Sequence, residues 1–390
     1  MHTQLVVIQP TAFCNINCQY CYLSSHARSL ARRIEPETLE QVFKVLFASP
    51  FISDEILFVW HAGEPLVLPI DFYERALQSQ ERWNLKKVRV TNAIQTNATL
   101  ITQKWCQFFQ AREIHVGVSL DGPQALHDAY RTDRAGHGTF ERVMRGIQLL
   151  RAHAIPYTVI SVITNASVSH PKEFWDFFAE LAPQSIGLNP EEAEGANLVS
   201  SLRTEEDVVA YKAFVQHLLA LNASSSHPLV VREIEELIGL IDSSAPTLQT
   251  LMNMPMGILS FDYAGNFSTF SPELLTMAHP SQGDFLFGNV FANSLEDLLV
   301  SPKFLRTYQE IQQGINLCKT TCAYFPICGG GSPSNKLQEN GSFASSETMA
   351  CRLQIQAPAD ALLEHLEASY NLPPASFPDE LTGYASPPQG

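Results

Sequence analysis

Residues 13–21 read Phe13-Cys14-Asn15-Ile16-Asn17-Cys18-Gln19-Tyr20-Cys21. The three cysteines have a C-x3-C-x2-C spacing and follow directly after the apolar run at residues 5–8. Three thiolates on one short loop can hold three irons of a [4Fe-4S] cube and leave the fourth iron without a protein ligand. An iron with an open position can bind a small molecule. The loop therefore predicts an iron-sulfur site for chemistry at the end of a β-strand.

Clustered cysteines can also bind zinc or form disulfides. A structural zinc site needs four ligands, and the fourth would have to come from a distant cysteine or from His26. A disulfide framework is unusual in a chain of 390 residues with eight cysteines and no secretory signal. Chance clustering stays open, but it does not predict the motifs downstream. We favour the iron-sulfur cluster because the spacing matches an iron-sulfur run and the loop follows a strand.

The composition narrows the class of protein. The formal net charge is -15, and because general nucleic-acid binding needs a basic face, we expect no nucleic-acid partner. No apolar stretch is long enough to span a bilayer, so we expect no membrane partner either. Met1 leads almost at once into the first strand, without a visible targeting segment. Reduced thiols that can hold a cluster imply a cytoplasmic, oxygen-poor environment.

The first 225 residues alternate short β-branched apolar runs with amphipathic stretches of helical period. This alternation predicts an α/β fold in which repeated βα units form a partial (β/α)6 barrel. Strands are expected at 5–8, 56–60, 88–95, 114–120, 157–163 and 186–188, and helices at 37–46, 72–81, 103–110 and 140–153. Thr102 and Thr139 are amino-terminal signals for the last two helices. Ligands of parallel α/β folds gather at the carboxyl ends of the strands, where the motifs below lie.

The cysteine triplet, with the aromatic Tyr20 before its last cysteine, resembles the signature of the radical SAM superfamily. In that superfamily the open iron is chelated by the amino and carboxylate groups of S-adenosylmethionine (SAM). The resemblance implies that one electron cleaves SAM to a 5'-deoxyadenosyl radical, which abstracts hydrogen from a substrate. The cofactor supplies this chemistry, and the protein supplies position and a dry site.

A turn after the second expected strand resembles the Gly-Gly-Glu-Pro motif of this superfamily. It reads His61-Ala62-Gly63-Glu64-Pro65, with Ala62 in place of the first glycine. Small residues in such a turn expose backbone carbonyl groups. Together with the carboxylate of Glu64, these acceptors suit the ammonium group of SAM.

The resemblance also assigns residues at the ends of the other strands. Ser119 would contact the ribose hydroxyls, and Arg131 the methionine carboxylate, because a guanidinium can donate two parallel hydrogen bonds to a carboxylate. The alternative for Arg131 is a solvated arginine on a helix face. Thr96 and Asn97 are expected to line the same site, and the backbone of Leu188 to contact the adenine.

A second group of cysteines comprises Cys318, Cys322, Cys328 and Cys351. Four thiolates complete one closed [4Fe-4S] cube or one tetrahedral zinc site, and spacing alone leaves both open. The arrangement resembles the SPASM module, which carries auxiliary clusters in peptide-modifying radical SAM enzymes. This resemblance favours iron, so we expect two [4Fe-4S] clusters per chain.

The module departs from the usual SPASM pattern of seven cysteines for two clusters. Phe270 stands where the second early cysteine is expected, and Ser332 takes the position four after Cys328. The ligands of the nearer auxiliary cluster are therefore missing, whereas those of the farther one remain. In the same region Glu273 is a candidate base or peptide-anchoring carboxylate, and its alternative is a helix-start glutamate after Pro272.

These patterns together predict five parts of the chain. A radical SAM barrel is expected at 1–225, a helical linker at 226–254 and a SPASM-like module at 255–353. A helix at 354–371 and a flexible Pro-rich tail at 372–390 follow.

The overall pattern most resembles the cyclophane-forming SPASM maturases of the glycine-rich-repeat type, GrrM and OscB. Such enzymes join an aromatic ring to the Cβ of a residue two positions later in a ribosomal precursor peptide. The implied reaction removes a hydrogen from Cβ, forms the carbon-carbon bond, and passes one electron to the auxiliary cluster. A flavodoxin or ferredoxin-type protein would be the reductant.

Two alternatives remain for the function. One is an anaerobic sulfatase maturase that forms formylglycine, although Ser271 stands where those enzymes have a catalytic aspartate. The other is a non-catalytic metal-binding peptide scaffold.

Overall fold

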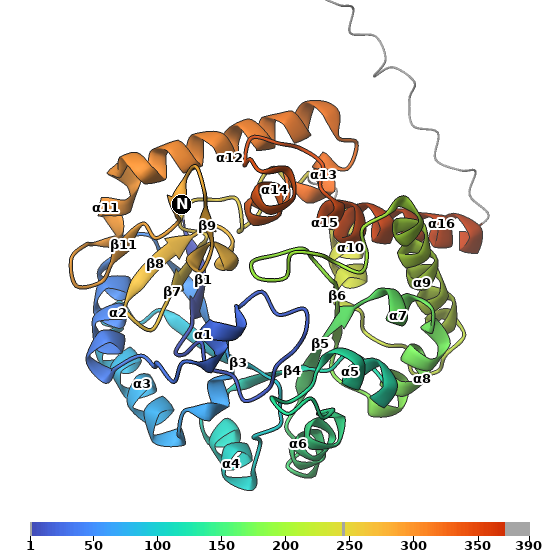
Figure 1. Ribbon diagram of the computed structural model, residues 1–390, viewed down its shortest axis with the longest axis horizontal. Coiled ribbons are helices and arrows are strands. Elements are labelled where there is room, and N and C mark those ends of the chain that lie inside the picture. The colour runs from blue at the N-terminus through green and yellow to red at the C-terminus, as the bar shows by residue number, and fades with distance from the viewer. Residues whose placement is uncertain (1, 244–245, 371–390) are drawn as a thin grey trace, which may run out of the picture.

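A nine-stranded sheet forms the centre of the computed structural model, which describes residues 2–243 and 246–370. The strand order is β11-β8-β7-β1-β2-β3-β4-β5-β6, and all neighbours from β1 to β6 pair in parallel. Figure 1 shows these strands curving around the middle of the molecule, with helices outside them. The α/β fold with a partial (β/α)6 barrel is therefore confirmed.

All six expected barrel strands are present, with small differences at their ends. They are β1 (Thr3–Ile8), β2 (Ile52–Trp60), β3 (Arg89–Thr96), β4 (His115–Ser119), β5 (Tyr157–Ile163) and β6 (Ile186–Pro190). β2 begins four residues before the expected position, because its polar start still pairs along β1, with Thr3 opposite Ile52. Backbone pairing extends this strand beyond the apolar run that revealed it.

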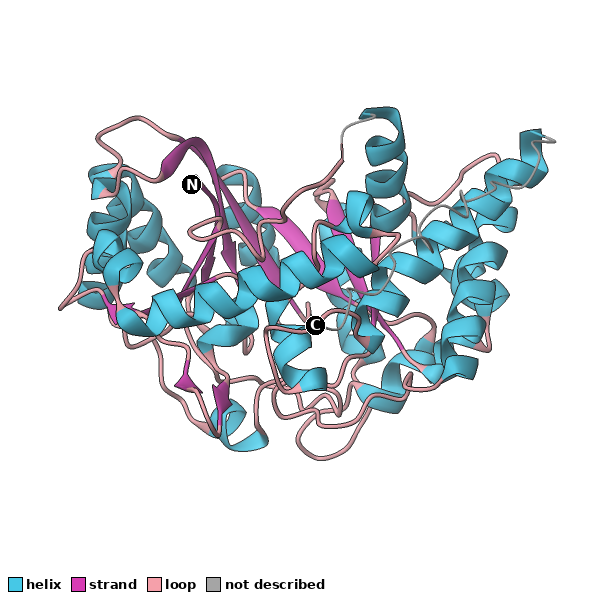
Figure 2. Cartoon of the chain, turned by 90° about the horizontal axis from the view of Figure 1, so that it is seen from above, coloured by secondary structure: helices cyan, strands magenta, loops and turns pink. Residues whose placement is uncertain are grey.

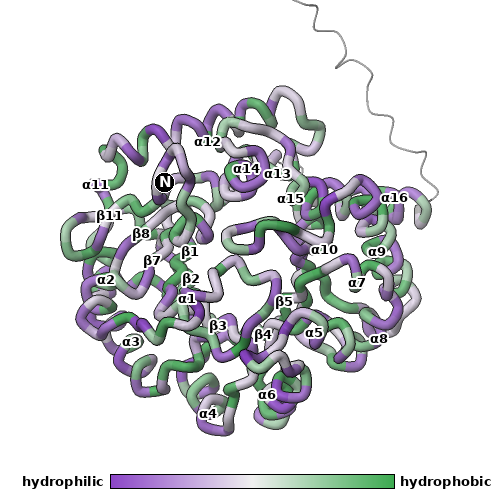
Figure 3. Tube along the Cα trace, in the orientation of Figure 1, coloured by the Kyte–Doolittle hydropathy of each residue, from purple (hydrophilic) through white to green (hydrophobic). Residues whose placement is uncertain are grey.

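Helices cover the outside of the barrel. They are α2 (Pro36–Ala48), α3 (Ile70–Trp83), α4 (Gln103–Ala111), α5 (Gln124–Tyr130), α6 (Phe140–Ala152), α7 (Asn165–Val168), α8 (Pro171–Leu181) and α9 (Glu205–Ala223). In Figure 3 hydrophobic and hydrophilic residues alternate along them, as in helices that cover a sheet with one face. Thr102 caps α4 as expected, whereas the hydroxyl of Thr139 donates to the carbonyl of Arg131 instead of capping α6.

The strands of the expected SPASM-like module extend the barrel sheet. β7 (Ile258–Phe261) pairs in parallel with β1, and β8 (Asn266–Thr269) pairs antiparallel with β7. β11 (Gly288–Asn289) completes that side, while β9 (Ala278–His279) and β10 (Gly283–Asp284) form a separate pair. β1, which leads into the cysteine loop, is thus flanked by a strand on each side.

The remaining helices lie after the barrel in the chain. They are α10 (Arg232–Ser243), α11 (Leu295–Val300), α12 (Pro302–Thr321), α13 (Phe325–Cys328), α14 (Pro333–Asn340), α15 (Met349–Cys351) and α16 (Ala357–Tyr370). Figure 2 shows, from above, how helices surround the strands. α10 falls within the expected linker and α16 matches the expected carboxyl-terminal helix, whereas the Pro-rich tail lies outside the described residues. Among the helices of the described part, none is both long and apolar enough to cross a membrane.

Candidate active site

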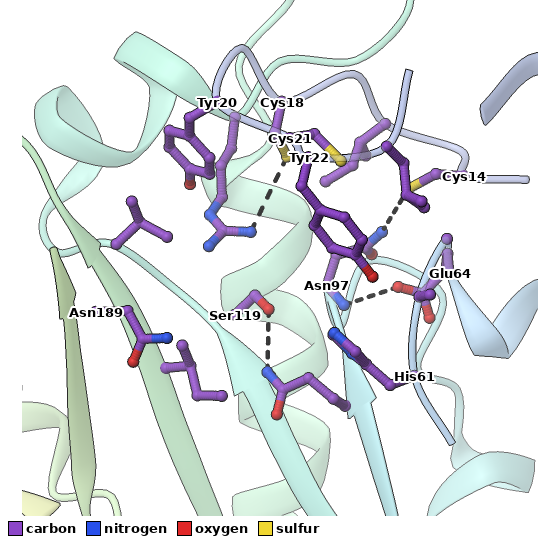
Figure 4. Close-up of a pocket in the computed structure, with 18 of the residues that line it drawn as sticks. Cys14, Cys18, Tyr20, Cys21, Tyr22, His61, Glu64, Asn97, Ser119 and Asn189 are labelled. Atoms are coloured by element: carbon purple, nitrogen blue, oxygen red, sulfur yellow. Dashed lines mark hydrogen bonds between the residues drawn. The ribbon is translucent and has the colours of Figure 1, made fainter. Parts of the chain in front are cut away.

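The carboxyl ends of the barrel strands open into a cleft of about 290 Å³. Most of the residues that the sequence predicted for the site line this cleft. They include Cys14, Cys18, Tyr20, Cys21, His61, Ala62 and Gly63. Further expected residues that line it are Glu64, Thr96, Asn97, Ser119, Arg131 and Glu273. Figure 4 shows the cysteines on the loop above this space, with Ser119 and Asn97 on the strand side. Residues that are far apart in sequence therefore share one cleft.

Leu188 is placed differently from the other expected residues. Its backbone N–H donates to the carboxylate of Glu233 at 2.9 Å, and Leu188 is not among the described residues that line the cleft. The next two residues, Asn189 and Pro190, do line it. Contact with the adenine from the sixth strand thus stays a prediction for Leu188, and Asn189 is the better placed side chain.

The cysteine loop is held against the strand ends by polar contacts. Arg134 donates to the carbonyl oxygen of Cys14 at 2.7 Å, and the amide of Asn97 lies 3.8 Å from the Cys14 sulfur. Burial raises the pKa of Cys14 to about 12 and that of Cys18 to about 11. Iron binds thiolates, so a cluster at this loop would have to displace the protons that burial favours.

The turn at residues 61–65 packs directly against this loop. Gly63 has a φ of +58°, and a Cβ at this position would lie 2.5 Å from the carbonyl oxygen of Phe13. The N–H of Glu64 donates to the same oxygen at 2.8 Å. Glycine is therefore required at position 63 for both its conformation and its size. Burial lowers the pKa of His61 to about 4, which leaves a neutral imidazole at the cleft.

Glu64 joins the ends of two strands. Its carboxylate accepts hydrogen bonds from the Thr96 hydroxyl at 2.6 Å, from the Asn97 N–H at 2.8 Å and from the Leu66 N–H at 2.9 Å. The side chain is 1% exposed, and burial raises its pKa to about 7 despite these donors. A carboxylate so placed suits an ammonium group, which would stabilise its charged form.

Arg131 is paired with Asp121 in the interior. Its Nε and Nη2 each donate to Asp121 at 2.9 Å, and Tyr20 donates to the same carboxylate. The remaining nitrogen, Nη1, lies 4.0 Å from the sulfur of Cys18. Arg131 is thus not a solvated residue on a helix face, and its expected contact with the methionine carboxylate, which stays a prediction, would use this nitrogen.

Arg28 was missed by the sequence reasoning. It is 7% exposed, lines the cleft, and donates through Nε to the carbonyl of Leu23 at 3.0 Å. Its Nη1 is buried without a hydrogen-bond partner among the described residues. A buried, unpaired guanidinium nitrogen beside three thiols fits a negatively charged group in the cleft, such as a cluster or a carboxylate. Its position seven residues after Cys21 was the only available signal.

Three further acidic residues join Glu273 at the cleft. Glu191, Glu192 and Glu194 follow β6, and all three line the cleft. Burial raises the pKa of Glu273, raises that of Glu192 to about 7, and raises that of Glu194 further above its ordinary value. Burial therefore makes the carboxyl groups of Glu192, Glu194 and Glu273 stronger proton acceptors than exposed glutamates.

The second group of cysteines lines a separate cavity of about 390 Å³. The four sulfur-bearing residues Cys318, Cys322, Cys328 and Cys351 all border it, as does Lys336. Within the described part of the chain, no three or more His, Cys, Asp or Glu side chains are arranged to hold a single metal ion. The cavity is many times the volume of one water, about 30 Å³, so it has room for a polyatomic group such as a cube.

The sequence predicts that the chain lacks the nearer auxiliary cluster of the SPASM pattern. Side chains without sulfur occupy the positions of its missing cysteines. Phe270 is fully buried and stacks on Phe304, with ring centroids 5.8 Å apart. Ser271 and Ser332 lie together, with hydroxyl oxygens 3.0 Å apart. Ser332, at one of the two positions at which the SPASM pattern has cysteines, thus contacts Ser271, the neighbour of the other such position, Phe270, and neither position carries a thiol.

The sequence profile of the radical SAM superfamily matches residues 8–182. An uncharacterized protein of Synechocystis sp., sll1766, is 41% identical over 374 residues, which are 95% of this chain and 94% of the relative. The chain belongs to the radical SAM superfamily. It is therefore an enzyme that uses a [4Fe-4S] cluster and SAM, and the cleft residues described above fit that pair.

Named relatives and solved structures extend this result over most of the chain. The serine-type anaerobic sulfatase-maturating enzyme of Bacteroides thetaiotaomicron is 26% identical, covering 89% of this chain and 86% of the relative. The structure of anSMEcpe with bound AdoMet and Cp18Cys peptide has a TM-score of 0.77 at 21% identity, covering 95% of this chain and all of that one. Streptococcus suis SuiB bound to precursor peptide SuiA has a TM-score of 0.60 at 14% identity, covering 90% and 76%. These likenesses support the fold of the radical SAM domain and of the part that follows it.

Proposed function

We propose that this radical SAM enzyme oxidises one residue of a peptide substrate at its Cβ, in the manner of an anaerobic sulfatase maturase. A serine or cysteine side chain would become formylglycine. The observation that carries the proposal is the position of Glu273, which lines the same cleft as the three-cysteine loop and the expected SAM residues. A proton acceptor at that place suits an oxidation that releases one proton.

The oxidation balances with the groups named. When bound, the cofactors supply an adenosyl radical that takes a hydrogen atom from Cβ and an acceptor for one electron. With a serine substrate, Glu273 takes the hydroxyl proton at a carboxylate oxygen, and the Cβ–O bond becomes a double bond. With a cysteine substrate it takes the thiol proton, and water then replaces the sulfur of the resulting thioaldehyde, which leaves as hydrogen sulfide. The protein would hold SAM through Glu64, Ser119 and Nη1 of Arg131. A flavodoxin or ferredoxin-type protein would reduce the radical-site cluster.

Two observations support a peptide as the substrate. One relative that aligns with 89% of this chain is named a sulfatase-maturating enzyme, and solved structures of similar fold contain bound peptides. The carboxyl groups of Glu192, Glu194 and Glu273, on one side of the cleft, can accept hydrogen bonds from a peptide. A non-catalytic scaffold is disfavoured, because the chain has the residues of a radical SAM site.

The second candidate is a cyclophane-forming maturase of the GrrM and OscB type acting on a ribosomal precursor peptide. It is favoured by Phe270, Ser271 and Ser332, which fill the place of the nearer auxiliary cluster and leave no aspartate directly after position 270. This reaction also starts at Cβ and also releases one proton and one electron. The two candidates therefore share the site. They differ in the atom that loses the proton, which is the hydroxyl oxygen or thiol sulfur in formylglycine formation and the aromatic ring carbon in cyclophane formation.

A single assay separates the candidates. The enzyme is reconstituted with iron and sulfide under anaerobic conditions and is given reductant, SAM and a peptide that has an aromatic residue two positions before a serine. Both reactions remove two hydrogens from the peptide, but formylglycine alone reacts with a hydrazide. A crosslink instead joins the aromatic ring to Cβ in fragmentation spectra. A peptide unchanged in mass despite SAM cleavage would contradict both candidates.

The role of Glu273 has its own test. Glu273→Gln should retain SAM cleavage and lower peptide oxidation by about 10²- to 10⁴-fold, the usual contribution of a general base. Glu296 on α11 is not among the described residues that line the cleft, so Glu296→Gln is the matched control. Equal rates for Glu273→Gln and the unchanged enzyme would remove Glu273 from the mechanism.

A further inference from the structure

Lys336 is buried against the second group of cysteines. It lies on α14, is 4% exposed, and its Nζ donates to the sulfur of Cys318 at 3.2 Å. This is the hydrogen bond that the described residues provide for its ammonium group. Taking an ammonium out of water costs several kcal/mol unless an opposite charge compensates for it. A cysteine sulfur that ligates iron carries negative charge, and the sulfur of Cys318 lies at the required place.

The surroundings of Lys336 make this contact a specific one. Its side chain borders the cysteine cavity on one side and a small apolar space with Ile311, Ile315 and Phe343 on the other. In such surroundings electrostatic interactions are much stronger than in water. The charge of Lys336 therefore acts on the cavity with little screening.

We infer that Lys336 raises the reduction potential of the auxiliary cluster on Cys318, Cys322, Cys328 and Cys351, and so makes it a better acceptor for the electron from the substrate. This inference rests on the proposal that these cysteines hold iron and not zinc. Accepting an electron makes a cluster more negative, and a fixed positive charge with a hydrogen bond to a ligand sulfur stabilises that state. Hydrogen bonds to sulfur and local charge are known determinants of such potentials.

The exposed neighbour Lys319 provides a matched control. It follows Cys318 on the same helix α12, but its side chain is exposed. Its charge is therefore screened by water and salt. Lys336→Met keeps a long side chain without the charge, Lys336→Gln keeps a donor without the charge, and Lys336→Arg keeps both.

The test is a redox titration of the anaerobically reconstituted enzyme without peptide, followed by electron paramagnetic resonance. SAM is added to identify the radical-site cluster, whose signal it changes, so that the remaining signal belongs to the auxiliary cluster. Lys336→Met should lower the midpoint potential of the auxiliary cluster by at least about 59 mV, which corresponds to a tenfold change in the equilibrium constant of a one-electron reduction. Lys336→Arg should retain the potential, and Lys319→Met should leave it nearly unchanged.

Several results would overturn the inference. They are an unchanged midpoint in Lys336→Met at full iron content, a shift just as large in Lys319→Met, or zinc in the four-cysteine cavity. Loss of the auxiliary cluster from both Lys336→Met and Lys336→Gln would make Lys336 a structural residue and would also overturn it. Because no peptide is present, a lowered potential can be observed even if the proposed oxidation of serine or cysteine fails.

Discussion

The carboxylate of Asp121 binds both Nε and Nη2 of Arg131, each at 2.9 Å, in the interior beside the three-cysteine loop. The same carboxylate accepts from Tyr20 of that loop and from the N–H of Val162 on β5. Asp121 thus links the loop to two segments of the barrel. The ion pair positions a charged residue at the cleft and also holds the cysteines over the strand ends.

Removing one partner of this buried pair should destabilise the protein. Asp121→Asn leaves the Arg131 guanidinium without its counter-charge, and we expect the free energy of unfolding to fall by about 3–5 kcal/mol. Urea denaturation of the reconstituted enzyme measures this change. The control is Asp176→Asn at the exposed pair with Lys172, where the cost should stay below about 1 kcal/mol. Similar costs at the two sites would contradict the structural role of Asp121.

A methyl group at Gly63 should displace the cysteine loop. Gly63→Ala brings a Cβ to 2.5 Å from the Phe13 carbonyl, so we expect the radical-site cluster to be lost and the auxiliary cluster to remain. Iron should fall from about eight to about four per chain, by the number of irons in two cubes. Gly136 also has a positive φ, of +85°, but an added methyl group there would meet no described atom within 4 Å. Gly136→Ala should therefore keep its iron, and the same loss in both variants would show that strain, not contact, matters.

Binding of SAM should strengthen as the pH rises. The pKa of Glu64 is raised to about 7 by burial, so its carboxylate is about one tenth ionised at pH 6 and about nine tenths ionised at pH 8. Because the ionised carboxylate is the better acceptor for the N–H groups of the iron-bound amino group, the affinity for SAM should increase about tenfold over this range, as measured by anaerobic titration calorimetry. Glu64→Gln should abolish the pH dependence. A flat profile in the unchanged enzyme would argue against contact between Glu64 and the amino group of SAM.

The stability of the SAM-free protein should change with the opposite sign. The folded state holds the proton of Glu64 more tightly than the unfolded state, because the folded pKa is the higher one. The contribution of this group is therefore complete below the ordinary pKa of about 4.5 and is lost as the pH rises towards 7. Urea denaturation at pH 5 and pH 7.5 measures the difference, and Glu64→Gln should reduce it.

Substitutions in the two groups of cysteines should affect different functions, SAM cleavage in one case and peptide oxidation in the other. Cys14→Ser should abolish SAM cleavage and retain the auxiliary cluster, whereas Cys351→Ser should halve the iron content, retain SAM cleavage and lose peptide oxidation. Cys106, fully buried on α4 and outside both groups, is the control, and Cys106→Ser should keep its full iron content. Loss of SAM cleavage in Cys351→Ser would contradict two separate sites.

The barrel could be predicted from the sequence because its strands are short β-branched runs and its motifs follow them directly. Tyr157–Ile163 even has the expected bounds. The pairing of β7 with β1 could not be predicted, because the partners are some two hundred and fifty residues apart and local pattern carries no information on register. Arg28, Glu191, Glu192 and Glu194 were missed for a related reason, because the path of a loop decides whether its side chains face the cleft.

The pairing of β1 with β7 also bears on the order in which the protein matures. Leu5 lies opposite Ile258, so the strand that leads into the cysteine loop has an unpaired edge during synthesis until that distant segment has been made. A ribosome-bound chain that already contains Cys14, Cys18 and Cys21 therefore still lacks one of the two strands that pair with β1. We expect iron to be inserted after the chain is complete, because pairing with β7 is needed to hold β1 and the cysteine loop that follows it.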